Sequence, residues 1–288
     1  MNRRIVVTGS SGKLGSRVVR DLSAHGLEVV PIDVRAHDDP ALPPTRVMDL
    51  RSVGDLVRAM EGAQAVCHLG NLPNFGHIEA SEGYANNVCA TFNVCHAAWQ
   101  AGVRRIVNAS SIQAYGSFGA YPHPPLYLPL DEDHPLLPRD GYPLSKAESE
   151  FIVASFVRRD ERISAFSLRF TAITTTDRRR PKTDRPERRV ANIAGSLLTY
   201  VPVAEAARAV RMCCLAEHTG HTALNIVAPE SASPWTAQML RDAYGLVPEF
   251  RRALSPTDPL IAWEKARDVI GFVAELPVVP AEQAAQNP

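Results

Sequence analysis

Short apolar runs alternate with helical patterns along the first 170 or so residues of the chain. Residues 4–7 form an apolar run of strand type, and an apolar helix face follows at Leu14, Val18, Val19 and Leu22. Residues 27–32 form a second strand pattern that ends at Asp33. This alternation predicts a parallel sheet that is covered by helices on both faces.

The pattern changes after Phe170. Residues 177–189 combine seven basic side chains with three acids and two prolines, which is the composition of a loop. A helix pattern follows over residues 203–215, and residues 222–227 read as a short strand. We expect this strand to return to the sheet.

A glycine-rich turn separates the first strand from the first helix. Strand, glycine-rich turn and helix form the unit that seats a pyrophosphate on helix N–H groups. Gly9 permits the tight turn, Gly12 the close approach of a phosphate, and Gly15 close packing of helix on strand. Asp33 lies 18 residues after Gly15, where a carboxylate accepts hydrogen bonds from ribose hydroxyls and repels a 2′-phosphate. NAD is therefore predicted over NADP. NADP stays the alternative cofactor, because the basic side chain of Arg35 can tolerate a 2′-phosphate.

A second motif places Tyr142 four residues before Lys146. With Pro143 in the first turn of a helix, the two side chains share one helix face. A nearby ammonium favours the phenolate, so we expect Lys146 to lower the pKa of Tyr142. A tyrosine tuned in this way exchanges a proton with a carbinol oxygen.

Composition favours a soluble enzyme without nucleic-acid or membrane partners. The formal charge is zero, so no overall field attracts nucleic acid or an anionic membrane, and no 18-residue apolar run is present. Five cysteines without a C-x-x-C pair, and no signal-peptide pattern, predict a reduced cytoplasmic setting. Cys213 and Cys214 near His218 and His221 are read as reduced cysteines, and no metal site is expected.

Taken in order, these motifs resemble the extended short-chain dehydrogenase/reductases, in particular the NAD-dependent epimerase/dehydratase group. The G-x-x-G-x-x-G spacing is that of the group, and further matches lie at residues 65–70, 87–94, 105–111 and 167–170. The resemblance covers roughly residues 3–230. It implies an α/β fold with a Rossmann doubly wound parallel sheet, divided into an NAD-binding domain (1–170) and a small C-terminal substrate-binding part (171–288).

The resemblance also implies roles for individual residues. Ser111 would hold the reacting oxygen, Tyr142 would move its proton, and Lys146 would bind the nicotinamide ribose, while hydride passes between the substrate carbon and NAD. The residues implied for cofactor binding are Gly9, Ser11, Gly12, Lys13, Leu14, Gly15, Asp33, Asp49, Leu50, Leu69, Gly70, Asn87, Tyr142 and Lys146. Together these residues imply that the protein is an NAD-dependent oxidoreductase.

The substrate is less constrained. Dehydratases of the family carry an Asp-Glu pair after the catalytic hydroxyl residue, whereas this chain has Ile112 and Gln113 there, which argues against a dehydratase. Only 118 residues follow Phe170, which is short for the family's nucleotide-sugar epimerases and weakens that interpretation. Residues 67–70 and 198–205 resemble instead uronate-dehydrogenase-like members, which hold a sugar carboxylate with an arginine. Predicted substrate contacts are Asn71, Ser111, Arg178, Arg179 and Arg180, and a solvated loop is the alternative for the three arginines.

Two other functions stay open. One is a nucleotide-sugar epimerase with tightly held NAD, and the other is a non-catalytic NAD(P)-binding regulator. The presence of Ser111, Tyr142 and Lys146 together favours an enzyme acting on a sugar or sugar acid.

Relatives of this kind form homodimers through two helices, here at about residues 84–101 and 142–157. Both helices carry more apolar residues than one core face needs, namely Val88, Phe92, Val94, Trp99, Phe151, Ile152 and Phe156. We therefore expect a homodimer.

Overall fold

The computed structural model describes residues 3–73, 75, 78–119, 121–174, 191 and 193–275. In this part of the chain, a seven-stranded sheet contains β1 (Arg4–Thr8), β2 (Glu28–Asp33), β3 (Arg46–Val47), β4 (Ala65–His68), β5 (Arg105–Ser111), β7 (Ser164–Phe170) and β10 (Gly220–Ile226). The strand order is β10-β7-β5-β4-β1-β2-β3, and the neighbouring strands pair in parallel. The predicted doubly wound parallel sheet is confirmed.

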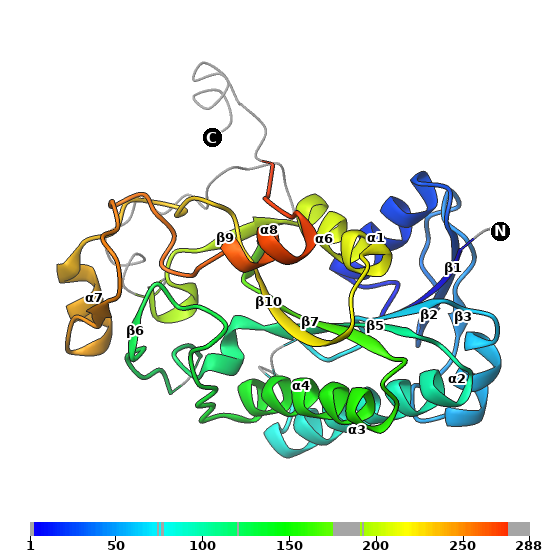
Figure 1. Cartoon of the computed structure of the whole chain (residues 1–288). Helices are drawn as coiled ribbons and strands as arrows, with labels where there is room; N and C mark the ends of the chain where they lie inside the picture. The colour runs from blue at the N-terminus through cyan, green and yellow to red at the C-terminus, as the bar shows by residue number, and fades with distance from the viewer. Residues whose placement is uncertain are drawn as a thin grey trace.

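Helices cover both faces of this sheet (Figure 1). One face carries α2 (Val53–Met60), α3 (Ala80–Gln100) and α4 (Gly141–Arg159), and the other carries α1 (Lys13–Ala24), α6 (Val203–Leu215) and α8 (Glu264–Ile270). Helix α6 has the bounds predicted from the sequence, and β10 pairs with β7 as the expected returning strand.

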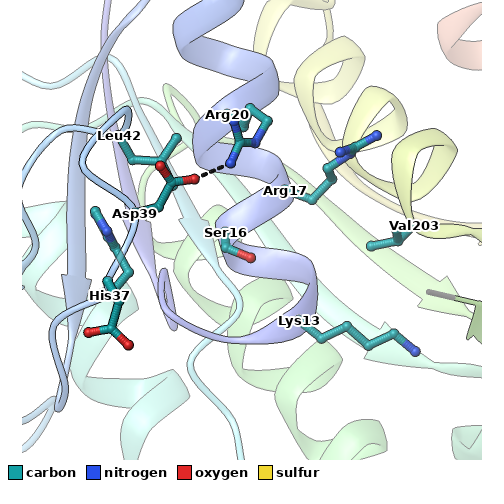
Figure 2. Close-up of a pocket in the computed structure, with 9 residues that line it drawn as sticks. Lys13, Ser16, Arg17, Arg20, His37, Asp39, Leu42 and Val203 are labelled. Atoms are coloured by element: carbon teal, nitrogen blue, oxygen red, sulfur yellow. Dashed lines mark hydrogen bonds and ion pairs between the residues drawn. The ribbon is translucent and has the colours of Figure 1, made fainter. Parts of the chain in front are cut away.

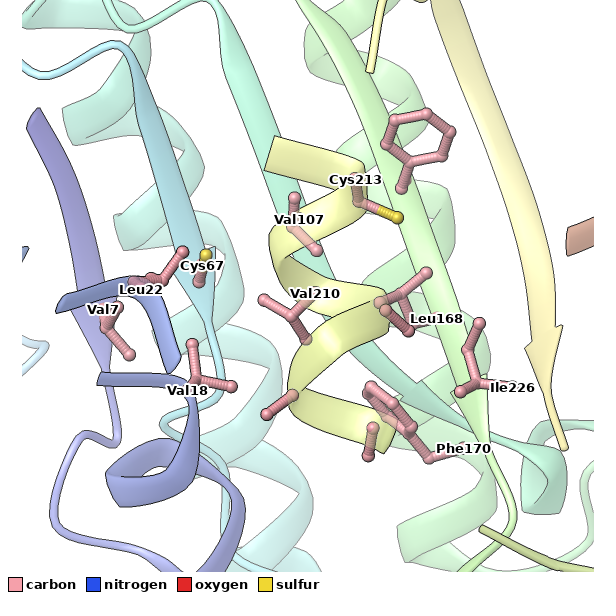
Figure 3. Close-up of a cluster of buried hydrophobic side chains, with 14 of the residues drawn as sticks. Val7, Val18, Leu22, Cys67, Val107, Leu168, Phe170, Val210, Cys213 and Ile226 are labelled. Atoms are coloured by element: carbon pink, nitrogen blue, oxygen red, sulfur yellow. The ribbon is translucent and has the colours of Figure 1, made fainter. Parts of the chain in front are cut away.

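The apolar strands supply two core layers, one on each side of the sheet. Val7 faces a layer formed with Leu22 of α1 and Val210 of α6 (Figure 3). Its neighbour Val6 belongs to the opposite layer, together with Val153 of α4. Successive side chains of a strand point to opposite faces, so a strand buried on both faces is apolar throughout.

A third apolar cluster lies outside these two layers and includes Tyr115, Leu128, Leu197, Trp235 and Leu260. The elements nearby are the 3-10 helix η1 (Ile112–Tyr115), the strand pair β6 (Tyr127–Leu128) and β11 (Glu249–Phe250), and α7 (Ala237–Tyr244). Strands β8 (Ala172–Thr174) and β9 (Tyr200–Pro202) form another pair. Because the cluster combines residues from before and after position 170, the division into domains at that point stays a prediction.

Two of the apolar residues assigned to the predicted dimer interface are part of the core. Val94 and Phe156 are buried beneath the sheet, because α3 and α4 pack on the sheet and on each other and so need more than one apolar face. Phe92 and Phe151 remain 48% and 65% exposed.

The cysteines are free thiols, with the sulfur atoms of Cys67 and Cys214 3.2 Å apart. No helix in the described residues is long and apolar enough to cross a bilayer. Within the same residues, no group of three or more His, Cys, Asp or Glu side chains is arranged to hold a metal ion.

Candidate functional site

The glycine-rich turn lies where the strand order of the sheet reverses. The chain passes from β1 outwards to β2, and from β4 outwards to β5 in the opposite direction. Ligands of open α/β sheets bind beyond the carboxyl ends of the strands at such a point. Gly9 has φ +69°, and a Cβ there would lie 2.6 Å from backbone atoms of Leu69 and Gly70. The turn after β1 and the loop after β4 are therefore in contact, and a side chain at Gly9 would separate them.

The next two glycines set the start of α1. A Cβ on Gly15 would lie 1.9 Å from the Gly9 carbonyl oxygen, so the helix packs directly on the turn. At Gly12 the Gly9 oxygen, at 3.2 Å, is the one described neighbour that a Cβ would meet. No side chain among the described residues caps the helix at Gly12. The tight turn predicted at Gly9 is confirmed, and Gly15 allows the close packing predicted for it, although against the turn rather than the strand. The open side of Gly12 fits the approach of a phosphate to the N–H groups at the helix start, and binding of a cofactor there stays a prediction.

Asp33 holds the glycine-rich turn from the end of β2. Its Oδ2 accepts a 2.9 Å hydrogen bond from the Ser11 N–H, and its Oδ1 accepts one of 3.2 Å from the Arg35 N–H. The Ser11 hydroxyl donates to the Arg35 carbonyl oxygen at 2.7 Å. On the other side of the turn, Lys13 donates from Nζ to the Ile173 carbonyl oxygen of β8. The predicted ribose-binding carboxylate thus lies beside the predicted phosphate-binding turn.

The remaining residues predicted for the cofactor surround the loop after β4. Leu50 lies against Gly70, where a Cβ would meet its Cδ1 atom at 2.9 Å. Asn87 of α3 accepts from the Leu72 N–H at 2.8 Å and donates to the Leu72 carbonyl oxygen at 3.1 Å. Asp49 pairs with Arg51 at 2.6 Å, and Leu14 packs against the core layer of α1. Their contacts with a cofactor stay predictions.

The three residues predicted to be catalytic lie together. Ser111 ends β5, and Tyr142 and Lys146 lie in the first turns of α4, with Pro143 in the first turn as predicted. Helix α4 begins after Asp140, whose Oδ1 accepts from the Gly141 N–H at 2.7 Å. The side chain of Ser111 lies close enough to Tyr142 to favour its phenolate. The Lys146 Nζ lies 5.6 Å from the centre of the Tyr142 ring, so the shared helix face is confirmed.

The predicted lowering of the Tyr142 pKa is wrong. Burial raises the pKa of Tyr142, and the interaction with Ser111 lowers it by less. Burial disfavours the charged phenolate, and the Lys146 ammonium donates to the carbonyl oxygen of Ala109 at 2.8 Å. Burial also lowers the pKa of Lys146 to about 8, against the opposing effect of Glu150. At neutral pH, Tyr142 is a phenol.

Among the residues predicted to bind substrate, Asn71 has a distinctive environment. Its Nδ2 and Oδ1 atoms are both buried, and neither has a hydrogen-bond partner in the described residues. A buried amide without partners is costly, so these two atoms are suited to bind a ligand. Arg178, Arg179 and Arg180 lie outside the described residues.

Sequence reasoning missed a buried polar network behind the catalytic residues. The Ser110 hydroxyl donates to Glu150 Oε1 at 2.5 Å, and Glu150 forms a 2.8 Å ion pair with Arg169 of β7. Glu150 follows Lys146 by four residues, so the helix spacing that relates Tyr142 to Lys146 would also have pointed to it.

A separate hollow of about 330 Å³ lies between α1, the segment after β2 and the start of α6 (Figure 2). Its lining includes Lys13, Arg17 and Arg20 from α1, and Arg20 forms an ion pair with Asp39 across it. Among the described residues, Lys13 is the one predicted site residue that lines this hollow. The candidate active site is therefore a different place.

Comparison with known families identifies the chain more closely. The model of the NAD dependent epimerase/dehydratase family matches residues 5–207. The chain belongs to this family. A UDP-glucose 4-epimerase from Bacillus subtilis (strain 168) is 30% identical over 182 residues, which are 58% of this chain and 51% of that protein. A GDP-mannose 3,5-epimerase from Arabidopsis thaliana is 27% identical over 156 residues, 52% of this chain and 41% of that protein. The chain thus spans about half the length of the first of these curated relatives.

Solved structures resemble the chain over nearly its whole length. MoeE5 in complex with UDP-glucuronic acid and NAD has a TM-score of 0.69 at 25% identity, covering 95% of this chain and 94% of that chain. A short-chain dehydrogenase/reductase superfamily protein from Agrobacterium tumefaciens with bound NAD has a TM-score of 0.69 at 26% identity, covering 96% and 93%. Similarity to the extended short-chain dehydrogenase/reductases is confirmed, while the uronate-dehydrogenase-like branch stays a prediction.

Proposed function

We propose that this member of the family is an NAD-dependent oxidoreductase that transfers a hydride at a carbinol or carbonyl carbon of a sugar or sugar acid. The observation that carries the proposal is the meeting of Ser111, Tyr142 and Lys146 at the end of β5, on the same sheet edge as the glycine-rich turn after β1. Two neighbouring hydroxyl groups, with an ammonium on the same helix face, are suited to hold a carbinol oxygen and move its proton.

The glycine-rich turn supports NAD as the cofactor, which when bound accepts or gives the hydride. Free N–H groups at the start of α1 would hold the pyrophosphate, and Asp33 would accept hydrogen bonds from the adenosine ribose. The loop that Asn87 fixes lies on the other side of the turn, where Leu69 and Gly70 would border the cofactor.

In this scheme each catalytic side chain has one task. Ser111 orients the reacting oxygen and favours the Tyr142 phenolate, which burial disfavours. As a phenol at neutral pH, Tyr142 has the proton that a carbonyl oxygen needs on reduction, and oxidation requires the phenolate. Lys146 supplies positive charge near Tyr142, and Asn71 offers the substrate an amide that has no partner among the described residues.

A turnover experiment tests the proposal. Purified protein with NAD is offered a panel of uronates, free sugars, polyols and UDP-sugars, and NADH absorbance and product formation are followed. On the best substrate, Tyr142→Phe should lower kcat/KM by roughly 100- to 10,000-fold, the usual contribution of a general acid or base. Tyr121→Phe is the matched control, since Tyr121 is 64% exposed, and it should leave kcat/KM within about twofold. Tight NAD binding without turnover of any substrate would indicate the regulator instead.

A nucleotide-sugar epimerase is the second candidate. MoeE5, named in complex with UDP-glucuronic acid, is covered over 94% of its length by this chain, so the length of the C-terminal part no longer argues against a nucleotide sugar. An epimerase returns the hydride to the same substrate. Interconversion of UDP-sugars in the product analysis, with no accumulation of NADH, would therefore identify it.

A further inference from the structure

A buried ion pair lies behind Ser111, Tyr142 and Lys146 and has no part in the proposed proton transfer. Arg169 of β7 donates to Glu150 of α4 from Nε at 2.9 Å and from Nη2 at 2.8 Å. The two side chains are 6% and 7% exposed. Removing two charges from water is costly, so such a pair persists when further hydrogen bonds satisfy it.

Those further bonds lead to the active site on one side and to the C-terminal part on the other. Glu150 Oε1 accepts from the hydroxyl of Ser110, the residue before Ser111, at 2.5 Å. Arg169 Nη1 donates to the Tyr115 hydroxyl at 2.9 Å, and Tyr115 donates to Asn225 Oδ1 at 2.8 Å. The ion pair thus joins α4 to the end of β5 and to β10.

Lys146 lies one helical turn before Glu150, on the same face of α4. It is 4% exposed, and an ammonium with so little contact with water needs a counter-charge to remain protonated. The titratable groups that interact with Lys146, with Glu150 or with the ion-pair partner Arg169 are Tyr142 on α4, Tyr115 on η1, Glu132 after β6, His68 on β4 and His221 on β10.

Burial keeps most of these neighbours neutral. It raises the pKa of Tyr142 and of Tyr115, and it lowers the pKa of His68 to about 3 and of His221 to about 4. Glu150 is the carboxylate that acts on Lys146, where its effect opposes the lowering of the Lys146 pKa by burial, whereas the Glu132 carboxylate acts on Arg169 and Tyr115.

Resting on the proposed function, we propose that Glu150 is a positioning residue for this site: held by Arg169, it fixes Ser110 at the end of β5 and supplies the charge that keeps Lys146 an ammonium. It does so without contact with substrate or cofactor. The carboxylate therefore has two separable effects, one on geometry and one on the protonation of Lys146.

The protonation of Lys146 can be measured without any substrate. The chain has four lysines, so protein labelled with ¹³C at lysine Cε gives few NMR signals, and the Lys146→Met variant assigns the one of interest. We expect a midpoint of about 8 in the wild type. In Glu150→Gln the midpoint should fall by about one unit or more, the usual effect of losing a neighbouring opposite charge. Glu150→Asp keeps the charge and should stay near the wild-type midpoint.

Glu148→Gln is the matched control, because it removes a carboxylate of the same helix that lies two residues away. Its Lys146 midpoint should equal that of the wild type. A role of Glu150 in stability alone would lower Tm in both Glu150 variants and leave the Lys146 titration unmoved, and that result would overturn the proposal.

Kinetics give a second measurement once a substrate is known. If charged Lys146 is required, kcat/KM for carbonyl reduction, in which Tyr142 acts as the phenol, falls as pH rises through the Lys146 pKa, and Glu150→Gln moves this alkaline limb to lower pH. The loss relative to wild type should be within about twofold at pH 6 and approach about tenfold at pH 9. A loss of the same size at every pH would contradict the electrostatic part. Because the NMR titration needs no turnover, failure of the proposed function leaves the inference about Lys146 testable.

Glu150→Gln leaves Arg169 buried without its partner and is expected to be less stable. Should it not fold, the double variant Glu150→Met with Arg169→Met removes both charges and retains apolar volume, which is often neutral for stability. Its Lys146 midpoint should also lie below that of the wild type. An unchanged midpoint in the folded double variant would overturn the proposal.

Discussion

The Nζ atom of Lys146 donates a 2.8 Å hydrogen bond to the carbonyl oxygen of Ala109, two residues before Ser111. The bond fixes the ammonium against the end of β5, where water has little access. Burial lowers the pKa of Lys146 to about 8 from its usual 10.5. A charge held at this position is therefore a cost to folding, which a catalytic role would explain.

Replacing Lys146 should stabilise the fold at neutral pH. The unfolded chain binds the proton more tightly than the folded one, so the ammonium destabilises the native state below pH 8, and this penalty disappears as pH rises from about 8 to 10.5. A difference of 2.5 units corresponds to about 3 kcal/mol. Lys146→Met should raise the free energy of unfolding in urea by up to about 3 kcal/mol at pH 7, with a smaller gain at pH 10.

Lys265→Met serves as the control for loss of a lysine, since no shift in stability of this kind is expected for a partly exposed side chain on α8. Lower stability of Lys146→Met at pH 7 would mean that the bond to Ala109 outweighs the burial of the charge.

The sheet and the principal motifs could be predicted from the sequence because each depends on local patterns. Strands buried on both faces are apolar throughout, as at Val6 and Val7, and the turn needs glycine at Gly9 for a positive φ. The spacing of Tyr142 and Lys146 gave their shared helix face in the same way.

Other features depend on contacts between distant segments. The ion pair of Glu150 with Arg169 joins α4 to β7, and neither residue looks buried from the polarity of its own segment. The pKa of Tyr142 depends on how deeply α4 packs, which spacing does not reveal. The third apolar cluster combines irregular segments around Leu128 and Leu260, which carry no helix or strand period.

Asp33 should make the protein prefer NAD to NADP. A 2′-phosphate beside its carboxylate is expected to cost more than about 1.4 kcal/mol, so the dissociation constant for NAD should be at least about tenfold lower. Asp33→Asn removes the charge and keeps an oxygen that accepts a hydrogen bond from the Ser11 N–H, so the turn should be retained. The difference between the dissociation constants for NAD and NADP should become smaller. Isothermal titration calorimetry measures the dissociation constants of both cofactors. Equal constants in the wild type would contradict the prediction and indicate that Arg35, and not Asp33, determines the cofactor preference.

One of Arg178, Arg179 and Arg180 is proposed to bind the carboxylate of a sugar-acid substrate. Loss of a charge-assisted pair of this kind typically costs about 2–4 kcal/mol, so one of the three alanine variants should lower kcat/KM by roughly 30- to 1,000-fold. NAD affinity and Tm should remain unchanged. If all three variants stay within about twofold of the wild type on the best uronate, the arginines have no role in binding, and a neutral sugar or a nucleotide sugar becomes the better substrate.

A homodimer should form through the outer surface of α3 and α4. Phe92 and Phe151, one on each helix, are 48% and 65% exposed, and two such aromatic side chains on one face are suited to a self-complementary interface. Light scattering at micromolar concentration should give twice the chain mass of 31.4 kDa. Phe92→Glu with Phe151→Glu should give the monomer mass, because burying two carboxylates per chain opposes association. Leu246→Glu is the control, an exposed apolar residue that follows α7, and it should remain dimeric. A wild-type monomer would rule out this interface, and a dimer that survives both glutamates would place it elsewhere on the surface.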